Sequence, residues 1–332
     1  MAFVLKPTEK VGKEISRLGC EQLGDAISRL TGPDRLDRSI HEARKCLKRS
    51  RALLALSQPA MSGKRFERED RRIRKIARNL ARVRDAHAMM ETVDKLGTTG
   101  GLLSAAERLR KELGARVASV NRGMDEGAMA RVVERLKKAQ SRFARLKLKN
   151  KWVMIEEGVT NTYRQARKSY RLAMETGQAQ AYHEWRKPMQ RHWRQMQLFA
   201  GLGNPALDVR IDKAQRLSQL LGDDHDLHML VEAVKAGKVK FGSDMERDEL
   251  LTTCECRLES LRQAAREEGE TLFAPKPREF RAMFANQIGR AAAQPVADEV
   301  PNLARADTAS ETTAGITMPS KPDGSETGLL GS

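Results

Sequence analysis

Two segments of the sequence place histidine, arginine and lysine on one face of a helix. A helix turns by about 100° per residue, so side chains three and four positions apart share a face. The first segment offers His41, Arg44, Lys45 and Lys48, and the second, 142 residues later, offers His183, Arg186, Lys187, Arg191 and Arg194. Guanidinium forks, ammonium groups and histidine all suit phosphate oxygens. These two faces therefore predict a phosphate-binding surface.

The repetition is what favours binding over an ordinary solvated face. A single helix of this kind would more often be a basic surface with one satisfied histidine. Here the histidine is followed at three positions by arginine and at four by lysine in both copies, and the opposite face is apolar in both. Two copies of the same amphipathic pattern indicate an internal duplication.

Two further cationic stripes accompany these segments, one in each half of the chain. Like charges one helical turn apart repel by a few tenths of a kcal/mol per pair, about 0.2–0.5, so an uncompensated stripe favours an external polyanion over a solvated face. The stripes predict a groove to which the helices at 9–30 and 206–236 contribute little charge. Their members are Arg71, Arg74, Lys75, Arg78 and Arg82 in one stripe, and Arg164, Arg167, Lys168 and Arg171 in the other.

An aspartate stands two positions before a histidine in both halves. Asp85 precedes His87, and Asp226 precedes His228. We expect the two aspartates to orient arginine or histidine side chains. The acidic and histidine-rich run at 223–228 also makes a metal site conceivable, but the first copy has arginine in place of one histidine, so we expect no metal and no cofactor.

The composition predicts an all-α protein. Leu, Ala, Arg, Glu and Lys dominate the 332 residues, only 4% are aromatic, and no stretch alternates as a strand would. Trp185 and Trp193 are expected in the core, so stacking of single-stranded bases has little support. Apolar periodicity and Gly or Pro stops predict helices at about 9–30, 36–57, 64–95, 102–121, 128–148, 151–175, 179–200, 206–236 and from the 237–243 break to 268.

Net charge and cysteine content indicate which partners and which cellular compartment to expect. The net charge is +17, and since residues 290–332 carry −3, the rest carries +20, which predicts attraction to polyanions. Four cysteines form no CxxC pair, so we expect free thiols. No signal-peptide core or membrane span is expected, which indicates a cytoplasmic protein, and residues 286–332 are predicted to form a disordered tail.

The paired motifs resemble the CHAD family, a histidine-bearing α-helical domain. The resemblance covers about residues 8–285. Pro188 and Gln190 depart from the family's basic pattern in the second helix. The matching pieces are His41-x-x-Arg44-Lys45, His183-Glu184-Trp185-Arg186-Lys187, Ala81-Arg82-Val83-Arg84-Asp85 and Leu220-Leu221-Gly222-Asp223-Asp224-His225-Asp226-Leu227.

The resemblance implies a fold and a function. It implies two pseudo-symmetric helical bundles, here 8–149 and 150–285, around a basic groove that binds inorganic polyphosphate, and some members are associated with polyhydroxyalkanoate granules. We therefore expect non-catalytic polyphosphate binding. The alternatives left open are a metal-dependent phosphohydrolase of polyphosphate or nucleotides, a protein that binds nucleic-acid backbones, and a protein coating storage granules.

Overall fold

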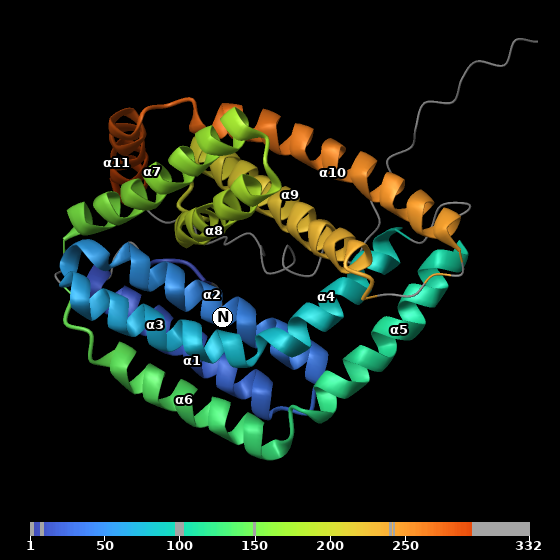
Figure 1. The fold of residues 1–332 in the computed structure, drawn as a ribbon. Coiled ribbons are helices and arrows are strands. Elements are labelled where there is room, and N and C mark those ends of the chain that lie inside the picture. The colour runs from blue at the N-terminus through green and yellow to red at the C-terminus, as the bar shows by residue number, and fades with distance from the viewer. Residues whose placement is uncertain are drawn as a thin grey trace, which may run out of the picture. The chain divides into compact units, whose positions relative to one another are not determined.

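The described residues of the computed structural model form helices and connecting loops without a strand (Figure 1). The described residues are 3–6, 10–96, 103–148, 151–238, 241 and 243–293. The prediction of an all-α protein is confirmed. The helices are α1 (Val11–Thr31), α2 (Leu36–Leu56), η1 (Gln58–Ala60), α3 (Gly63–Asn79), α4 (Ala81–Leu96), α5 (Leu103–Arg122), α6 (Glu126–Ala144), α7 (Trp152–Thr176), α8 (Ala179–Met196), η3 (Gln197–Phe199), α9 (Pro205–Lys235), α10 (Asp244–Phe273) and α11 (Pro277–Ala293).

Local signals explain where several helices begin and end. The Asn204 side chain accepts a hydrogen bond from the Leu207 backbone N–H, and Pro205 follows it at the first position of α9. Gly177 ends α7 at a φ of 62°, a left-handed conformation that favours glycine. Pro188 lies inside α8, and the helix continues through it from Ala179 to Met196.

The helix predicted at 64–95 is wrong as a single element. The structure divides it at Leu80 into α3 and α4, and Leu80 is fully buried at the break. Neither glycine nor proline occurs there. The break follows from tertiary packing, because both helices contact α2 but α3 also contacts α6, whereas α4 also contacts α5 and α9.

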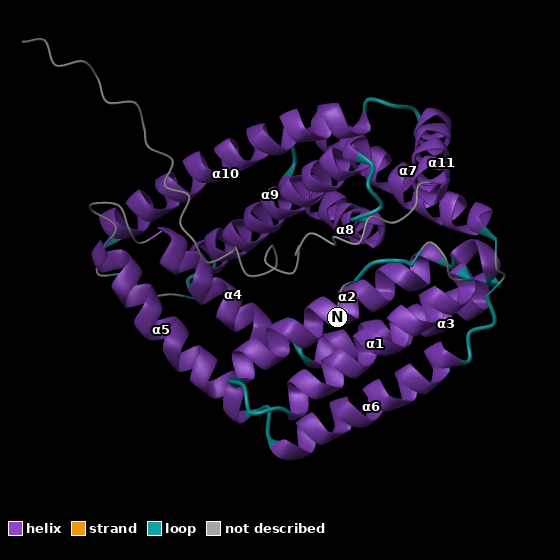
Figure 2. Ribbon diagram, turned by 180° about the vertical axis from the view of Figure 1, so that it is seen from behind, coloured by secondary structure: helices purple, strands orange, loops and turns teal. Residues whose placement is uncertain are grey.

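Two apolar cores hold the helices together, and each takes residues from both halves of the sequence. The larger core joins α1, α2, α3 and α6 to α7, α8 and the start of α9. The smaller core places Val93, Leu109 and Leu113 of α4 and α5 against Leu230 and Leu258 of α9 and α10. In Figures 1 and 2, α4 and α5 accordingly reach the ends of α9 and α10. The cores therefore do not coincide with the two sequence halves.

The two halves meet where α2 approaches α7 and α8. Gly158 of α7 lies against the backbone of Leu56, the last residue of α2, with no room for a side chain. Nearby, the Gln195 side-chain amide of α8 donates a hydrogen bond of 3.1 Å to the Ala52 carbonyl oxygen. This close approach sets the spacing of the two histidine-bearing helices.

The C-terminal boundary differs from the prediction. α11 extends from Pro277 to Ala293, so residues 286–293 belong to a helix, and the remainder of the predicted tail lies outside the described residues. Among the described helices, none has an apolar stretch long enough to cross a membrane. The four cysteines are free thiols, as expected.

Candidate functional site

The two histidine-bearing segments form α2 and α8, and these helices contact each other. In each of these two helices, the lysine that directly follows the motif arginine forms an ion pair with a glutamate of the same helix. Lys45 pairs with Glu42 at 3.0 Å, and Lys187 pairs with Glu184 at 2.6 Å. The repeated motif therefore makes the same local ion pair twice.

Lys48 lies at the centre of the basic residues of both halves. Burial by the surrounding helices, together with the charges of Arg194, Arg44, Arg186 and Arg84, lowers its pKa well below the usual value. Its side chain is nevertheless exposed to solvent. A side chain that is both open to water and enclosed by protein lies inside a groove. We call these five residues the central cluster.

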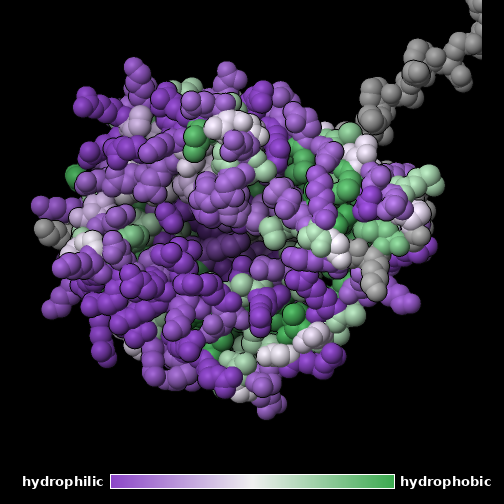
Figure 3. All heavy atoms as spheres, viewed as in Figure 1, coloured by the Kyte–Doolittle hydropathy of each residue, from purple (hydrophilic) through white to green (hydrophobic). Residues whose placement is uncertain are grey.

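Figure 3 shows a hollow lined by hydrophilic residues between the α7–α9 helices and α2, two of the regions from which the central cluster comes. We call this hollow the central groove. Arg44 is held by a hydrogen bond of 2.9 Å from Nη1 to the Ala77 carbonyl oxygen of α3. Arg194 is buried, with its guanidinium over the Trp193 ring at 4.6 Å. The cations therefore come from α2, α4 and α8 and are held by the helices around them.

Both motif histidines lie beside this cluster and are held neutral in the free protein. Burial, followed by the charges of Arg84 and Lys45, lowers the pKa of His41 to about 4. His183 places Nδ1 3.0 Å from Nδ1 of His225 on α9, and burial also lowers the pKa of His183. Burial and the charge of Arg186 lower the pKa of His225 to about 3. Each imidazole therefore lacks the charge that a nearby anion would favour.

The two motif aspartates lie near the central arginines, and in the described part of the chain neither forms an ion pair with them. Burial lowers the pKa of Arg44 and of Arg186, and the charges of Asp85 and Asp226 partly offset this. Burial raises the pKa of Asp226 itself, against the opposing charge of Arg84. The charges of the two aspartates therefore favour the charged forms of Arg44 and Arg186.

The acidic run at 223–228 is divided among several partners. Asp224 pairs with Arg262 of α10 at 2.8 Å, and Asp223 pairs with Lys95 of α4 at 2.9 Å. Within the described ranges, no group of three or more His, Cys, Asp and Glu side chains is arranged to hold a metal ion. Asp224 and Asp223 instead link helices of the smaller core.

Several of the cations predicted to bind phosphate have partners outside the central cluster. Arg167 donates from Nε to the Phe273 carbonyl oxygen of α10 at 2.8 Å, and Arg164 donates to the Asn161 side chain at 2.6 Å. Arg74 pairs with Asp70 at 2.7 Å. Arg191 contacts Gln165 at 3.4 Å, and burial and Arg51 lower its pKa. The exposed stripe members are Arg71, Arg74, Lys75, Arg78, Arg82, Arg164, Lys168 and Arg171.

Sequence reasoning missed two residues at this site. Arg84 approaches from α4 and pairs with Glu91 at 3.1 Å, and His225 approaches from α9. A spacing rule applied within one helix finds neither, because each reaches the groove from a different helix. The signal that was present is the alignment of Arg84 with His225 between the two copies.

Comparison with known proteins identifies the family of this chain. A family model described as the CHAD domain matches residues 21–235, well over half of the chain. The protein belongs to the CHAD family. The resemblance of the paired motifs is thereby confirmed.

A solved CHAD domain shares the fold. The crystal structure of the CHAD domain from the plant Ricinus communis superposes with a TM-score of 0.53. It is 16% identical in sequence, and the match covers 89% of this chain and 96% of that one. No curated protein matches this chain. At this identity, the similarity establishes the shared fold.

Proposed function

We propose that this CHAD protein binds inorganic polyphosphate in the central groove and releases it unchanged. The observation that supports the proposal most directly is the environment of Lys48. Four arginines from α2, α4 and α8 repel it, and after burial their charges are the largest influences on its pKa, although Asp226 also lies close enough to interact with it. A bound chain of phosphates would relieve this repulsion, because its charges lie among the cations. An arrangement that is unfavourable when empty is suited to a polyanion.

The shape of the cluster favours an extended ligand. Arg44 and Lys48 come from the first half, whereas Arg186 and Arg194 come from the second. Phosphates linked in a row offer an anionic oxygen at every unit, and arginine binds such oxygens with two parallel donors. Polyphosphate therefore reaches cations of both halves at once, whereas a single phosphate reaches only some of them.

The aromatic residues favour polyphosphate over single-stranded nucleic acid. Trp185 is fully buried and Trp193 is 8% exposed, which confirms that both belong to the core. Tyr163 and Tyr182 are also buried. The stacking of bases on exposed rings, which contributes about 1–3 kcal/mol per base in single-strand binding proteins, therefore has little support here.

Titration with long-chain polyphosphate at several salt concentrations tests the proposal. Binding releases condensed counterions, as it does for nucleic acids, so the logarithm of the affinity should fall linearly with the logarithm of salt. Five central cations predict a slope on the order of −3 to −5. An affinity that stays flat with salt would contradict a groove of cations. Competition with duplex DNA at matched salt distinguishes polyphosphate from a nucleic-acid backbone, and phosphate release with added divalent metal tests for hydrolysis.

Polyphosphate binding should be accompanied by proton uptake, so the affinity should rise as the pH falls. An anion beside His41 raises its pKa from the free value of about 4, so the bound state holds more protons and affinity increases on acidification. The increase ends near pH 4, where free His41 is also charged. Calorimetry at pH 6 in buffers of different ionisation enthalpy measures this uptake. His41→Gln should reduce it and His87→Gln should not, so equal uptake in wild type and His41→Gln would remove His41 from the site.

A further inference from the structure

A second basic pocket lies outside the central groove. It has a volume of about 580 Å³ and lies between the α3–α4 break, the end of α5 and α6. Pockets of about 300–1,000 Å³ are typical of small-molecule sites. Its lining includes the four arginines Arg78, Arg82, Arg131 and Arg135.

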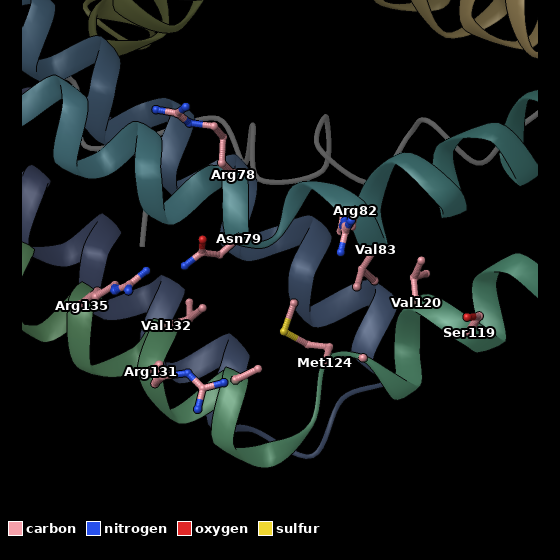
Figure 4. Close-up of a pocket in the computed structure, with 12 residues that line it drawn as sticks. Arg78, Asn79, Arg82, Val83, Ser119, Val120, Met124, Arg131, Val132 and Arg135 are labelled. Atoms are coloured by element: carbon pink, nitrogen blue, oxygen red, sulfur yellow. The ribbon is translucent and has the colours of Figure 1, made fainter.

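The pocket combines these cations with an apolar floor. Figure 4 shows Arg131 and Arg135 extending from α6 into the space beside the α3–α4 break, with Arg78 at the rim, turned away from α6. Val83 and Val132 form buried parts of the lining, and no acidic residue lines it among those that the structure describes. An apolar floor lowers the local dielectric and strengthens the attraction between guanidinium and anion.

Some other cations on the same helices are neutralised by carboxylates, whereas, among the described residues, the arginines of the pocket are not. On α6, Lys138 pairs with Glu134 at 3.3 Å and Arg142 with Glu69 at 3.6 Å. On α3, Arg72 pairs with Glu69 at 2.6 Å. No described carboxylate pairs with the four arginines that line the pocket. Arg131 and Arg135 of α6 therefore reach the pocket without a described carboxylate to neutralise them.

The pocket is separated from the central groove by α4. Arg82 lines the pocket, whereas Arg84 belongs to the central cluster. Residues two positions apart in a helix lie about 200° apart around its axis. The two guanidinium groups therefore leave opposite sides of the first turn of α4. A phosphate chain lying in the central groove would have to pass around the helix to reach the pocket.

We propose that this pocket is a second anion site, which binds a compact oligophosphate of a few phosphate groups. Its limited volume suits a short ligand, and its arginines supply planar donor pairs for several phosphate oxygens. The proposal goes beyond polyphosphate binding in the central groove and does not require it. It also gives a role to Arg78 and Arg82, which the sequence assigned to the groove, and to Arg131 and Arg135, which it did not single out.

Calorimetric titration with inorganic triphosphate tests the proposal in a Lys48→Glu background, in which the groove is weakened. Adding Arg131→Gln with Arg135→Gln should lower triphosphate affinity at least about tenfold, because two charge-assisted contacts are lost. The control adds Arg116→Gln with Arg145→Gln, two exposed arginines of the same region, and should change affinity less than about twofold. Thermal melting confirms that each variant is folded.

A parallel titration with long-chain polyphosphate uses the pocket double variant with Lys48 intact. Its affinity for the long chain should change less than about threefold, because the chain binds in the groove. The proposal is overturned by equal losses in the pocket and control variants, by an unchanged triphosphate affinity, or by no triphosphate binding in the Lys48→Glu background. It is also overturned by an equal loss for short and long chains, since the pocket would then be part of the groove. Triphosphate binding at the pocket would stand even if the groove bound no polyphosphate.

Discussion

Lys48→Glu should weaken polyphosphate binding by about a hundredfold at low salt, whereas Lys13→Glu should change it less than about twofold. A hydrogen bond between charged groups contributes about 1.5–3 kcal/mol, and 1.4 kcal/mol is a factor of ten. At position 48 the substitution removes such a contact and adds a negative charge at the centre of the cluster. Lys13 is exposed on α1 and undergoes the same charge change. Equal losses in the two variants would mean that net charge alone attracts the ligand.

Lys48→Met separates this effect from misfolding. The lowered pKa of Lys48 shows that its positive charge is unfavourable in the folded, free protein. Removing that charge should raise the melting temperature without ligand while weakening polyphosphate binding. A variant that melts at a lower temperature and binds as well as wild type would contradict the central position of Lys48.

Gly158→Ala should destabilise the fold by about 3 kcal/mol, which for a domain of this size lowers the melting temperature by roughly 6–12 °C. A methyl group on Gly158 would collide with the carbonyl oxygen of Leu56. Because this atom belongs to the backbone of α2, relief requires α7 and α2 to move apart. Circular dichroism during heating measures the change.

Gly222→Ala provides the matched control in α9. A methyl group there meets nothing within 4 Å. Alanine is favoured over glycine inside a helix by up to about 1 kcal/mol, so the melting temperature should stay the same or rise slightly. The packing indicates that the close approach of the two halves contributes to stability. Equal melting temperatures for Gly158→Ala and Gly222→Ala would contradict this.

The sequence predicted most helices because their apolar residues recur with the helical period and their ends carry ordinary stop signals. The helices observed as α1, α2, α7 and α9 begin and end within two residues of the predictions. The division at Leu80 was not predictable in this way. No residue near it breaks a helix locally, and its cause is the different packing of α3 and α4. α11 was missed because its segment follows two prolines and was assigned partly to the tail.

The candidate site shows the same division between local and tertiary information. The repeated motif identified Arg44 and Arg186, and the structure brings both into the central cluster. Spacing alone could not show that Arg167 donates to the Phe273 carbonyl oxygen of α10, because that partner lies 106 residues away in the sequence. Nor could it show that Arg194 lies close enough to Lys48 to lower its pKa. Patterns within one helix tell which side chains share a face, and packing decides what that face meets.

The smaller core has a consequence for the protein during its synthesis. Leu109 and Leu113 of α5 pack against Leu230 and Leu258, which the ribosome adds much later. At about 5–20 residues per second, the roughly one hundred residues between α5 and the relevant part of α9 take on the order of ten seconds. During that interval the apolar face formed by α4 and α5 has no partner from its own chain. A nascent chain stalled after residue 149 should therefore expose this face to chaperones and proteases, and the finished chain should cover it.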